Sequence, residues 1–430
     1  MQLDVAVIGA GAAGLAAGIF AGEAACERGQ PLRLAVFDGA RKPGAKILVS
    51  GGSRCNVTNE TVTETDYFGG PRTLIRRVLK RFNHTHTLRW MRELGVELKL
   101  EDTGKYFPVT DNSRTVLDAL LKRLEEVGAV LHAGARVVEL LPPRQPEESW
   151  RLHLDGAEPV TARRVILATG GLALPKSGSD GWGLEVMRRL GHTVVPTTPA
   201  LVPLRLDPAQ PGVGGRFAEF SGVTLEVRLG LYTQAGKRLE ERPGSLVFTH
   251  FGISGPAALD LSRHWLRAKR HEPHATFPVK LGVPELSTFE AAHGWLLEQG
   301  EAHPKRDVAT SLKAHLPERL ARAYAEVAGA DTFVALRKPV RKRLAHDLVG
   351  LPLAVCGDRG YAHAEVTAGG VDLREVDMRS MASKRLDNLY LVGEILDVDG
   401  RLGGFNFTWS WATGHIAGHA VVAAAAEERA

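Results

Sequence analysis

The start of the chain constrains the fold more than any other stretch. An apolar run, residues 1–8, leads without a spacer into the pattern Gly-x-Gly-x-x-Gly at residues 9–14. An Ala- and Gly-rich helical segment follows, and a second apolar run, residues 32–37, ends on Asp38. Strand, glycine turn, helix, strand and acid in this order predict a dinucleotide-binding α/β unit.

Each glycine of this pattern, and the acid that follows it, has a structural role in binding a dinucleotide. Gly9 allows the tight turn, Gly11 lets the backbone approach a pyrophosphate, and Gly14 lets the helix pack closely on the strand. The first-turn amides and the helix dipole then face the phosphates. Asp38 is expected to accept hydrogen bonds from ribose hydroxyls. It lies farther along the chain than the roughly 20 residues usual for this acid, so we expect residues 26–31 to form a longer helix end and loop.

Composition narrows the class of protein. The chain has 430 residues, enough for two or three domains, with 44% apolar and 24% charged residues, as in ordinary soluble proteins. A net charge of +5 fits an anionic cofactor or substrate. Basic segments at residues 72–81 and 337–343 carry apolar residues at helical spacing. We interpret them as solvated helix faces and do not expect a nucleic-acid partner.

The cysteines and the hydropathy pattern favour a cytoplasmic protein without a membrane span. Cys26, Cys55 and Cys356 form no C-x-x-C pair, which argues against a disulfide framework or a metal site and suits a cytoplasmic protein. The nearly uncharged residues 5–22 lack the preceding Lys or Arg of a signal peptide. No other stretch has about 18 uninterrupted apolar residues, so no membrane span is expected. Nothing in the sequence indicates an oligomeric state.

Periodicity predicts the elements that follow. One or two helices are expected over residues 71–94, and another over 110–127 with Asp111 or Ser113 as its cap. Strands are expected at residues 129–132, 136–141, 150–154 and 160–168. Residues 204–283 alternate like strands, residues 287–348 are helical, strands resume around 353–367, and a long helix begins near Asn406.

These shifts predict a divided domain organisation. The first domain comprises residues 1–195 and returns at residues 367–430. Within it we expect a β-rich domain, residues 196–286 with a return strand at 350–366, and a helical insert, residues 287–349.

Three further segments carry glycine-rich motifs. In the loop after Asp38, the amides of residues 50–52 with Arg41, Lys42, Lys46 and Arg54 suggest a nest for phosphate and for the edge of a cofactor ring; the alternative is a solvated loop. The strand ending at Ala168-Thr169-Gly170 opens into small residues, as beside a bound cofactor. Glycines in a turn at residues 365–371 suggest a further close approach of the backbone.

The last part of the chain has a second strand, glycine turn and helix in succession, like the first part. A buried-strand pattern at residues 388–392 precedes Gly393-Glu394, where the acid could bind flavin ribityl hydroxyls. Residues 403–406 then open the last helix, whose N-terminus would stabilise an anionic reduced flavin. The alternative is an ordinary glycine loop that caps a helix.

Together these motifs, with residues 50–59, 248–256 and 393–406, resemble the bacterial flavoproteins of the aminoacetone oxidase family, also called the BaiN-like or HI0933-like family. The resemblance covers essentially the whole chain. It implies an α/β fold with a glutathione-reductase-type, Rossmann-like FAD domain, an inserted β-barrel domain and a small helical domain.

The resemblance, with the motifs above, also implies the residues that contact non-covalent FAD. Two departures stand out: Asp38 replaces a common Glu, and Ser53 replaces a common glycine. The implied contacts are Gly9, Gly11, Ala12, Ala13, Gly14, Asp38, Lys46, Gly51, Gly52, Arg54, Cys55, Asn56, Val138, Ala168, Thr169, Gly170, Gly393, Glu394, Gly403, Gly404, Phe405 and Asn406.

Catalytic candidates follow from what flavin chemistry requires of a protein, which is orientation of the substrate and management of protons. His250, in an expected strand-to-helix turn, could act as acid or base; the alternative is a packed or solvent-facing histidine. Arg54 could anchor a substrate carboxylate or stabilise reduced flavin, or contact only phosphate or backbone. Cys55 near the ring is a nucleophile or a small packing residue.

The resemblance implies an FAD-dependent oxidoreductase that acts on a small organic substrate, by amine oxidation or by NAD(P)H-linked reduction of an unsaturated compound. Because no second Gly-x-Gly-x-x-Gly occurs in residues 110–194, NAD(P)H would bind only transiently. The alternatives are an RNA-modifying flavoprotein and a flavin-binding sensor or scaffold without turnover.

Overall fold

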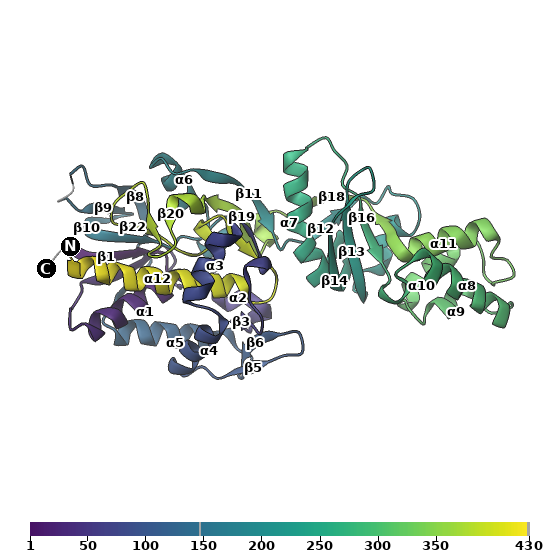
Figure 1. Cartoon of the computed structure of the whole chain (residues 1–430), viewed down its shortest axis with the longest axis horizontal. Coiled ribbons are helices and arrows are strands. Elements are labelled where there is room, and N and C mark those ends of the chain that lie inside the picture. Colours follow the sequence, from purple (N-terminus) through teal and green to yellow (C-terminus); the bar gives the residue numbers. More distant parts are fainter. Residues whose placement is uncertain (146–147, 428–430) are drawn as a thin grey trace. The chain divides into compact units, whose positions relative to one another are not determined.

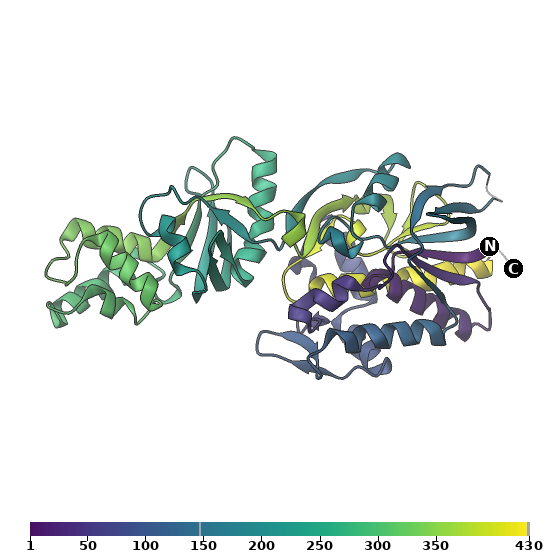
Figure 2. The same ribbon diagram turned by 180° about the vertical axis from the view of Figure 1, so that it is seen from behind.

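The structure is a computed structural model that describes residues 1–145 and 148–427 (Figures 1 and 2). The chain divides into two units: Met1–Thr198 with Glu365–Ala430, and Pro199–Ala364. Unit 1 therefore contains both the start and the end of the chain. The exact domain boundaries given above, and a closed barrel in unit 2, stay predictions.

A nine-stranded sheet forms the centre of unit 1, and its middle is parallel. Its strands Gln2–Ile8, Leu34–Asp38 and Leu389–Leu391 are fully or mostly buried apolar runs, as expected where helices cover both faces of a sheet, whereas Val130–Ala133 at the edge is partly exposed. The parallel strands, in spatial order, are β22 (Leu389–Leu391), β10 (Ala157–Leu167), β1 (Gln2–Ile8), β2 (Leu34–Asp38) and β7 (Val130–Ala133). Antiparallel additions are β20 (Val376–Asp377), β21 (Ala382–Ser383), β8 (Val137–Leu141) and β9 (Trp150–Leu154). The predicted Rossmann-like α/β fold is confirmed.

Helices α1 (Ala12–Glu27) and α12 (Phe405–Glu427) pack side by side against this sheet (Figure 1). A Cβ atom on Gly414 would lie 2.8 Å from the Ala16 Cβ, and one on Gly418 would lie 2.8 Å from the Ala17 oxygen. The two glycines thus let the helix backbones approach closely. Gly414 meets Ala13, Ala16 and Ala17 and Gly418 meets Ala17 and Ala21, so the helices run in the same direction and α12 begins about two turns before α1 along their shared direction.

The remaining helices of unit 1 agree in part with the sequence, from which no helix was predicted at residues 45–53 or 182–189. They are α2 (Ala45–Ser53), α3 (Arg72–Arg81), α4 (His84–Glu93), α5 (Ser113–Glu126) and α6 (Trp182–Arg189). Residues 39–59 were expected to be a loop, but residues 45–53 form α2, whose helical geometry breaks at Ser50–Gly52. The cap of α5 is neither Asp111 nor Ser113: the side chain of Asn112 accepts the Arg114 amide hydrogen at 3.0 Å, because the residue just before the first helical turn is the one whose oxygen reaches these amides.

Short strands complete unit 1. They are β3 (Thr58–Asn59), β4 (Tyr67–Gly69), β5 (Leu98–Leu100), β6 (Lys105–Pro108), β11 (Val194–Ala200), β19 (Val366–Val371) and β23 (Val398–Gly400). The expected turn at residues 365–371 is instead the buried strand β19. Its glycines serve packing, since a Cβ on Gly369 would lie 2.6 Å from the Pro196 oxygen and one on Gly370 2.6 Å from the Ile395 oxygen.

Unit 2 consists of a seven-stranded sheet and a group of helices. The sheet order is β17 (Leu351–Leu353), β16 (Val279–Gly282), β13 (Thr224–Tyr232), β14 (Arg238–Thr249), β15 (Gly252–Ser254), β12 (Leu204–Leu206) and β18 (Val355–Asp358). The helices are α7 (Pro256–His271), α8 (Phe289–Ala302), α9 (Val308–Leu312), α10 (Glu318–Ala328) and α11 (Lys338–Gly350). The strand-rich and helical stretches predicted from periodicity are confirmed, although α7 interrupts the first.

Candidate functional site

One edge of the unit 1 sheet collects the motifs of the sequence. Gly9 follows β1, Asp38 ends β2, Ala168 follows β10 and Gly393 lies just after β22. Because these strands are parallel, their carboxyl ends share one edge, which is where open α/β sheets bind ligands. We refer to this region as the cofactor edge.

The glycine turn is closed on two sides and open on the third. A Cβ on Gly9 would lie 2.5 Å from the Ala168 oxygen, and one on Gly14 would lie 1.8 Å from the Gly9 oxygen. A Cβ on Gly11 would meet nothing within 4 Å. Helix α1 starts beside this open position without a side-chain cap, so its first amides face outward and are available to an anion.

Asp38 holds the turn in place. Its Oδ2 accepts the Ala10 amide hydrogen at 2.6 Å and its Oδ1 accepts that of Ala40 at 2.7 Å. A carboxylate has lone pairs beyond these two bonds, and the contact with ribose hydroxyls stays a prediction.

Lys46 and Glu394, distant in sequence, meet at the cofactor edge. Lys46 Nζ lies 2.7 Å from Glu394 Oε2, and Glu394 Oε1 accepts the Thr367 amide hydrogen at 3.0 Å. The Thr367 hydroxyl in turn accepts the amide hydrogens of Leu172 and Ala173. Thr367 thereby links the chain after β10 to Glu394. The sequence gives no signal of this role, because a threonine inside a strand carries no pattern that reveals these partners.

The end of α2 turns into a left-handed stretch. Gly51, Gly52 and Ser53 have φ values of 55°, 68° and 67°. A Cβ on Gly52 would meet nothing within 4 Å, so one side of this turn is open, as the predicted nest requires. Ser53 adopts the strained conformation although it has a side chain.

Arg54 and Cys55 follow this turn in contrasting surroundings. The Arg54 guanidinium lies 3.9 Å from the centre of the Phe107 ring and donates to Glu101 at 2.6 Å, and that hydrogen bond raises the pKa of Arg54. Cys55 is fully buried, and burial raises the pKa of its thiol to about 12. A thiol in these surroundings stays protonated, which favours a packing role for Cys55.

Residues 56–59 fasten the start of α12. With its amide oriented to satisfy both ends, Asn56 accepts from the Gly404 amide at 3.1 Å and donates to the Thr58 oxygen at 2.9 Å. The Thr58 and Thr408 hydroxyls are 2.8 Å apart, and the Asn406 side chain bonds both backbone groups of Gly400. The N-terminus of α12 is therefore held firmly beside residues 55–59.

Three predicted contacts lie elsewhere along the edge. The Thr169 hydroxyl is buried and has no hydrogen-bond partner among the described residues. Gly170 faces the Ser179 side chain, whose Oγ would lie 2.6 Å from a Cβ there. Val138 is 44% exposed on β8, and its carbonyl accepts from the Trp182 indole at 3.1 Å.

His250 lies in unit 2, and its turn differs from the expectation. Residues 250–251 connect β14 to β15 as a hairpin, and α7 begins only at Pro256. The turn is therefore strand-to-strand. The imidazole is exposed and contacts the Phe251 ring edge to face, with centroids 5.1 Å apart.

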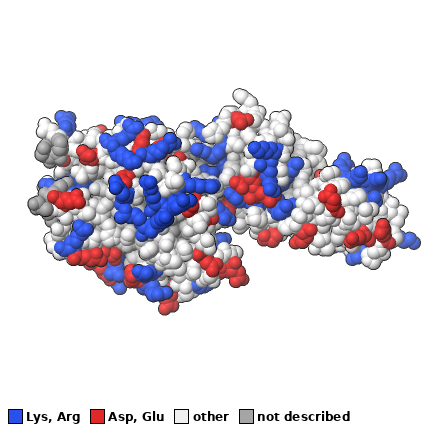
Figure 3. Space-filling view, in the orientation of Figure 1, with Lys and Arg blue, Asp and Glu red and all other residues white. Residues whose placement is uncertain are grey.

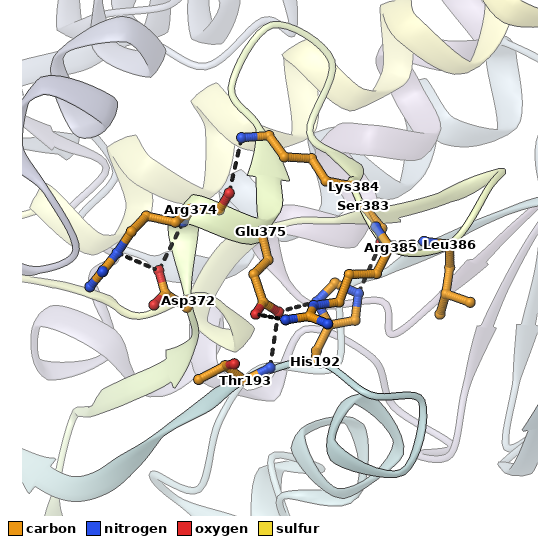
Figure 4. A network of polar contacts seen from close by, with 9 residues as sticks. All are labelled: His192, Thr193, Asp372, Arg374, Glu375, Ser383, Lys384, Arg385 and Leu386. Atoms are coloured by element: carbon orange, nitrogen blue, oxygen red, sulfur yellow. Dashed lines mark hydrogen bonds and ion pairs between the residues drawn. The ribbon is translucent and has the colours of Figure 1, made fainter.

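A second polar cluster lies in unit 1 around buried His192, and we call it the His192 network (Figure 4). Glu375 accepts the Thr193 amide hydrogen at 2.9 Å and pairs with Arg385, whose hydrogen bond lowers the pKa of Glu375 to about 2. His192 Nδ1 lies 3.0 Å from Glu375 Oε2, without hydrogen-bond alignment, and Nε2 lies 2.9 Å from Ser383 Oγ. Burial lowers the pKa of His192.

Serine, histidine and carboxylate in this order suggest a nucleophile, but the hydrogen bonds of Ser383 argue against it. Its Oγ accepts the amide hydrogens of Arg385 and Leu386, each at 3.0 Å. Both lone pairs are thus engaged, and the hydroxyl proton is left for His192 Nε2. The network joins the end of α6 to residues 375–386 and is structural.

The cofactor edge fits a dinucleotide. It offers an open backbone at Gly11, the N-termini of α1 and α12, which point the same way, and the buried Thr169 hydroxyl, which has no partner among the described residues. Backbone amides and hydroxyls are the donors that phosphates and sugar or ring oxygens use. No group of three His, Cys, Asp or Glu side chains within residues 1–145 and 148–427 is arranged to bind a metal ion. In the same ranges, no helix combines the length and apolar character that a bilayer crossing requires.

Comparisons with known proteins agree with this geometry. The chain is 31% identical to a ribosomal RNA dihydrouridine synthase of Escherichia coli (strain K12), over 98% of this chain and 99% of the relative. It is also 31% identical to a 3-dehydro-bile acid delta(4,6)-reductase of Clostridium scindens, over 97% and 98%. Among solved structures, a 3-ketosteroid delta1-dehydrogenase of Sterolibacterium denitrificans shares the fold, with a TM-score of 0.51 at 12% identity over 98% of this chain and 100% of that one. The model of the HI0933-like protein Rossmann domain matches residues 3–420, and the chain belongs to the HI0933-like family of FAD-dependent oxidoreductases.

Proposed function

We propose that this protein reduces a carbon–carbon double bond conjugated to a carbonyl group, with NAD(P)H as the electron donor and FAD as the bound cofactor. The observation that carries the proposal is the shared chemistry in the names of the two relatives. Dihydrouridine forms when hydrogen adds to the uracil double bond, and a 3-dehydro-bile acid delta(4,6)-reductase acts on double bonds conjugated to a ketone. Neither name describes amine oxidation, so we favour reduction.

The overall reaction adds one hydride and one proton across the double bond and converts NAD(P)H to NAD(P)⁺. Bound flavin supplies the two-electron transfer. In this proposal the amides of residues 11–14 hold the diphosphate, Asp38 the ribose and Glu394 the ribityl chain. The N-terminus of α12 adds positive electrostatic potential beside the ring.

Proton delivery is assigned to an acid of the chain or to solvent. His250 remains the proposed acid, because its imidazole is exposed and histidine is the side chain that most often acts as a general acid or base. Arg54 is proposed to hold a substrate oxygen, although Glu101 shares its guanidinium. For Cys55 we propose packing rather than reaction.

Anaerobic stopped-flow absorbance of the flavin-loaded protein tests the function. NADH or NADPH should bleach the flavin band, and an α,β-unsaturated ketone should then restore it, whereas the matching saturated ketone should not. Bleaching of oxidised flavin by amines would favour the oxidase alternative. If neither donor nor enone changes the spectrum, the reductase proposal is wrong and a non-catalytic flavin-binding role gains support.

A further inference from the structure

Trp182, the first residue of α6, has an aromatic ring that the rest of unit 1 covers only in part. Its side chain is half-buried, whereas five of the other six tryptophans are buried. The sixth, Trp295, is half-buried but contacts the His315 ring, with centroids 4.9 Å apart. The Trp182 indole has no aromatic partner within residues 1–145 and 148–427. Because a tryptophan gains most from burial of its large ring, the uncovered part of this indole suggests a place for a ligand.

Hydrogen bonds fix the position of the Trp182 ring. The indole Nε1 donates to the Val138 oxygen at 3.1 Å, and the backbone amide of Trp182 donates to Asp180 Oδ1 at 3.1 Å. Asp180 also accepts from Arg136 Nη2 at 2.5 Å. The start of α6 is thus joined at two points to the start of β8, which holds the indole in one orientation.

A β-bulge explains why the Val138 carbonyl can take this role. In the pairing of β8 with β9, Val137 lies opposite Leu154 and Glu139 lies opposite His153, so Val138 is the extra residue. The extra residue of a bulge stands outside the ladder of hydrogen bonds. Its carbonyl therefore bonds the indole.

The segment that holds Trp182 also borders the acid of the cofactor edge. Asp38 ends β2, and a Cβ atom on the next residue, Gly39, would lie 3.3 Å from the Arg136 Cβ. One residue farther, the Ala40 oxygen accepts the Gly134 amide hydrogen at 3.0 Å. The neighbours of Asp38 on this side are therefore the residues that lead into β8.

On its other side, the start of α6 contacts the chain that follows β10. The Gly181 amide donates to the Gly171 oxygen at 3.1 Å, and a Cβ atom on Gly183 would lie 1.9 Å from the Thr169 hydroxyl oxygen. Trp182 stands between these two glycines. Contacts thus run from Thr169 at the cofactor edge through the start of α6 to β8.

In a dinucleotide site, the acid at the end of the second strand binds the adenosine ribose. The adenine base then lies beyond Asp38, beside the residues that lead into β8. We propose that the Trp182 indole packs against the adenine base of FAD and makes the site prefer FAD to FMN, which has no adenine. An aromatic ring suits this role because every base has a face on which it can stack. The inference rests on the FAD site of the proposed function and adds a residue that determines its specificity.

Competition between two flavins tests the inference. The flavin-loaded protein is equilibrated with excess FAD and FMN at equal concentrations, and the bound flavins are separated and quantified by chromatography. Trp182→Ala should lower the ratio of bound FAD to bound FMN at least about tenfold, as expected when a stacked ring is lost. Trp182→Phe keeps a ring and should lower the ratio less than about threefold.

Trp295→Ala is the matched control, because it removes the other half-buried tryptophan, which lies in unit 2. Its ratio should equal that of the wild type. Lys and Arg side chains gather on one face of unit 1 (Figure 3) and attract any anionic flavin. Since FAD and FMN both carry phosphate, a ratio of the two largely removes this contribution.

The remaining outcomes contradict the inference. A wild-type ratio in Trp182→Ala would show that the indole does not contact adenine, and equal losses in the Ala and Phe variants would assign the effect to the hydrogen bond with Val138. If the wild type binds neither flavin, the FAD site of the proposed function is wrong as well. Thermal melts check folding; if Trp182→Ala does not fold, Trp182→Leu replaces it, because leucine keeps apolar packing without a ring.

Discussion

The cofactor edge and the His192 network both form where distant segments of unit 1 meet, yet they differ in how fully their polar groups are hydrogen-bonded. In the network, Glu375, Ser383 and Arg385 bond one another or nearby amides. At the cofactor edge, the Thr169 hydroxyl is buried and has no hydrogen-bond partner in residues 1–145 and 148–427, and a Cβ atom at Gly11 would meet nothing within 4 Å. Unsatisfied buried groups cost free energy. A buried hydroxyl without a partner beside an open glycine turn marks a place where a ligand would supply the missing contacts, whereas in the network only His192 Nδ1 lacks a hydrogen bond among the described residues.

The largest expected effect on stability comes from replacing Gly14 by Ala. The same replacement at Gly11 provides the comparison. Gly14→Ala places a methyl 1.8 Å from the Gly9 oxygen and should destabilise the protein by about 3 kcal/mol. Gly11→Ala meets no atom within 4 Å, so it should leave the melting temperature unchanged and weaken FAD retention. Thermal melts of the apoprotein and flavin titrations measure both. Equal stability of the two variants would show that the edge is not closed as described.

The pH dependence of stability tests the burial of His192 in its network. Burial lowers the pKa of His192 below its ordinary 6.5, so the unfolded chain takes up a proton that the folded one does not. The contribution to the unfolding free energy is therefore present above about pH 6.5 and is lost as the pH falls below it, by at most about 1.4 kcal/mol per pH unit. The Glu375 contribution, with a pKa near 2, should be lost only in stronger acid.

Urea melts at pH 7 and pH 5 of the wild type and of His192→Gln measure this effect. The variant should lose less stability between these pH values, because the other buried histidines are common to both proteins. An identical loss in the two proteins would place the titration outside the network.

A smaller effect is expected at the left-handed turn of the cofactor edge. Ser53 has φ 67°, so Ser53→Gly should stabilise the protein by about 0.5–1 kcal/mol after the entropic cost of glycine. Ser50, at φ −68°, is the matched control, and Ser50→Gly should destabilise by a similar amount. Denaturant melts distinguish the two; stabilisation by both would show that backbone strain is not the cause.

Much of the fold was predictable because its signals are local. The alternation of apolar residues predicted Trp150–Leu154 as β9 with the observed bounds, and 3.6-residue spacing predicted α3 and α4. The predictions were wrong where contacts with residues distant in sequence determine the local structure. The glycines of residues 369–370 suggested a turn, but they allow close packing of β19 on Pro196 and Ile395. His250 was expected before a helix, but β15 intervenes because it pairs with both β12 and β14.

The sequence by itself determined that a strand, a glycine turn, a helix and an acid open the chain, and that a second glycine turn opens its last helix, because each is a run of neighbouring residues with its own backbone preferences. Only the tertiary structure decided which groups share an edge. The pairing of Lys46 with Glu394, the hydrogen bonds of Thr367 and the joining of α3 to residues 374–385 depend on the packing of segments hundreds of residues apart. Contacts between such segments follow from the burial of their apolar faces, and no local pattern records which side chains that burial brings together.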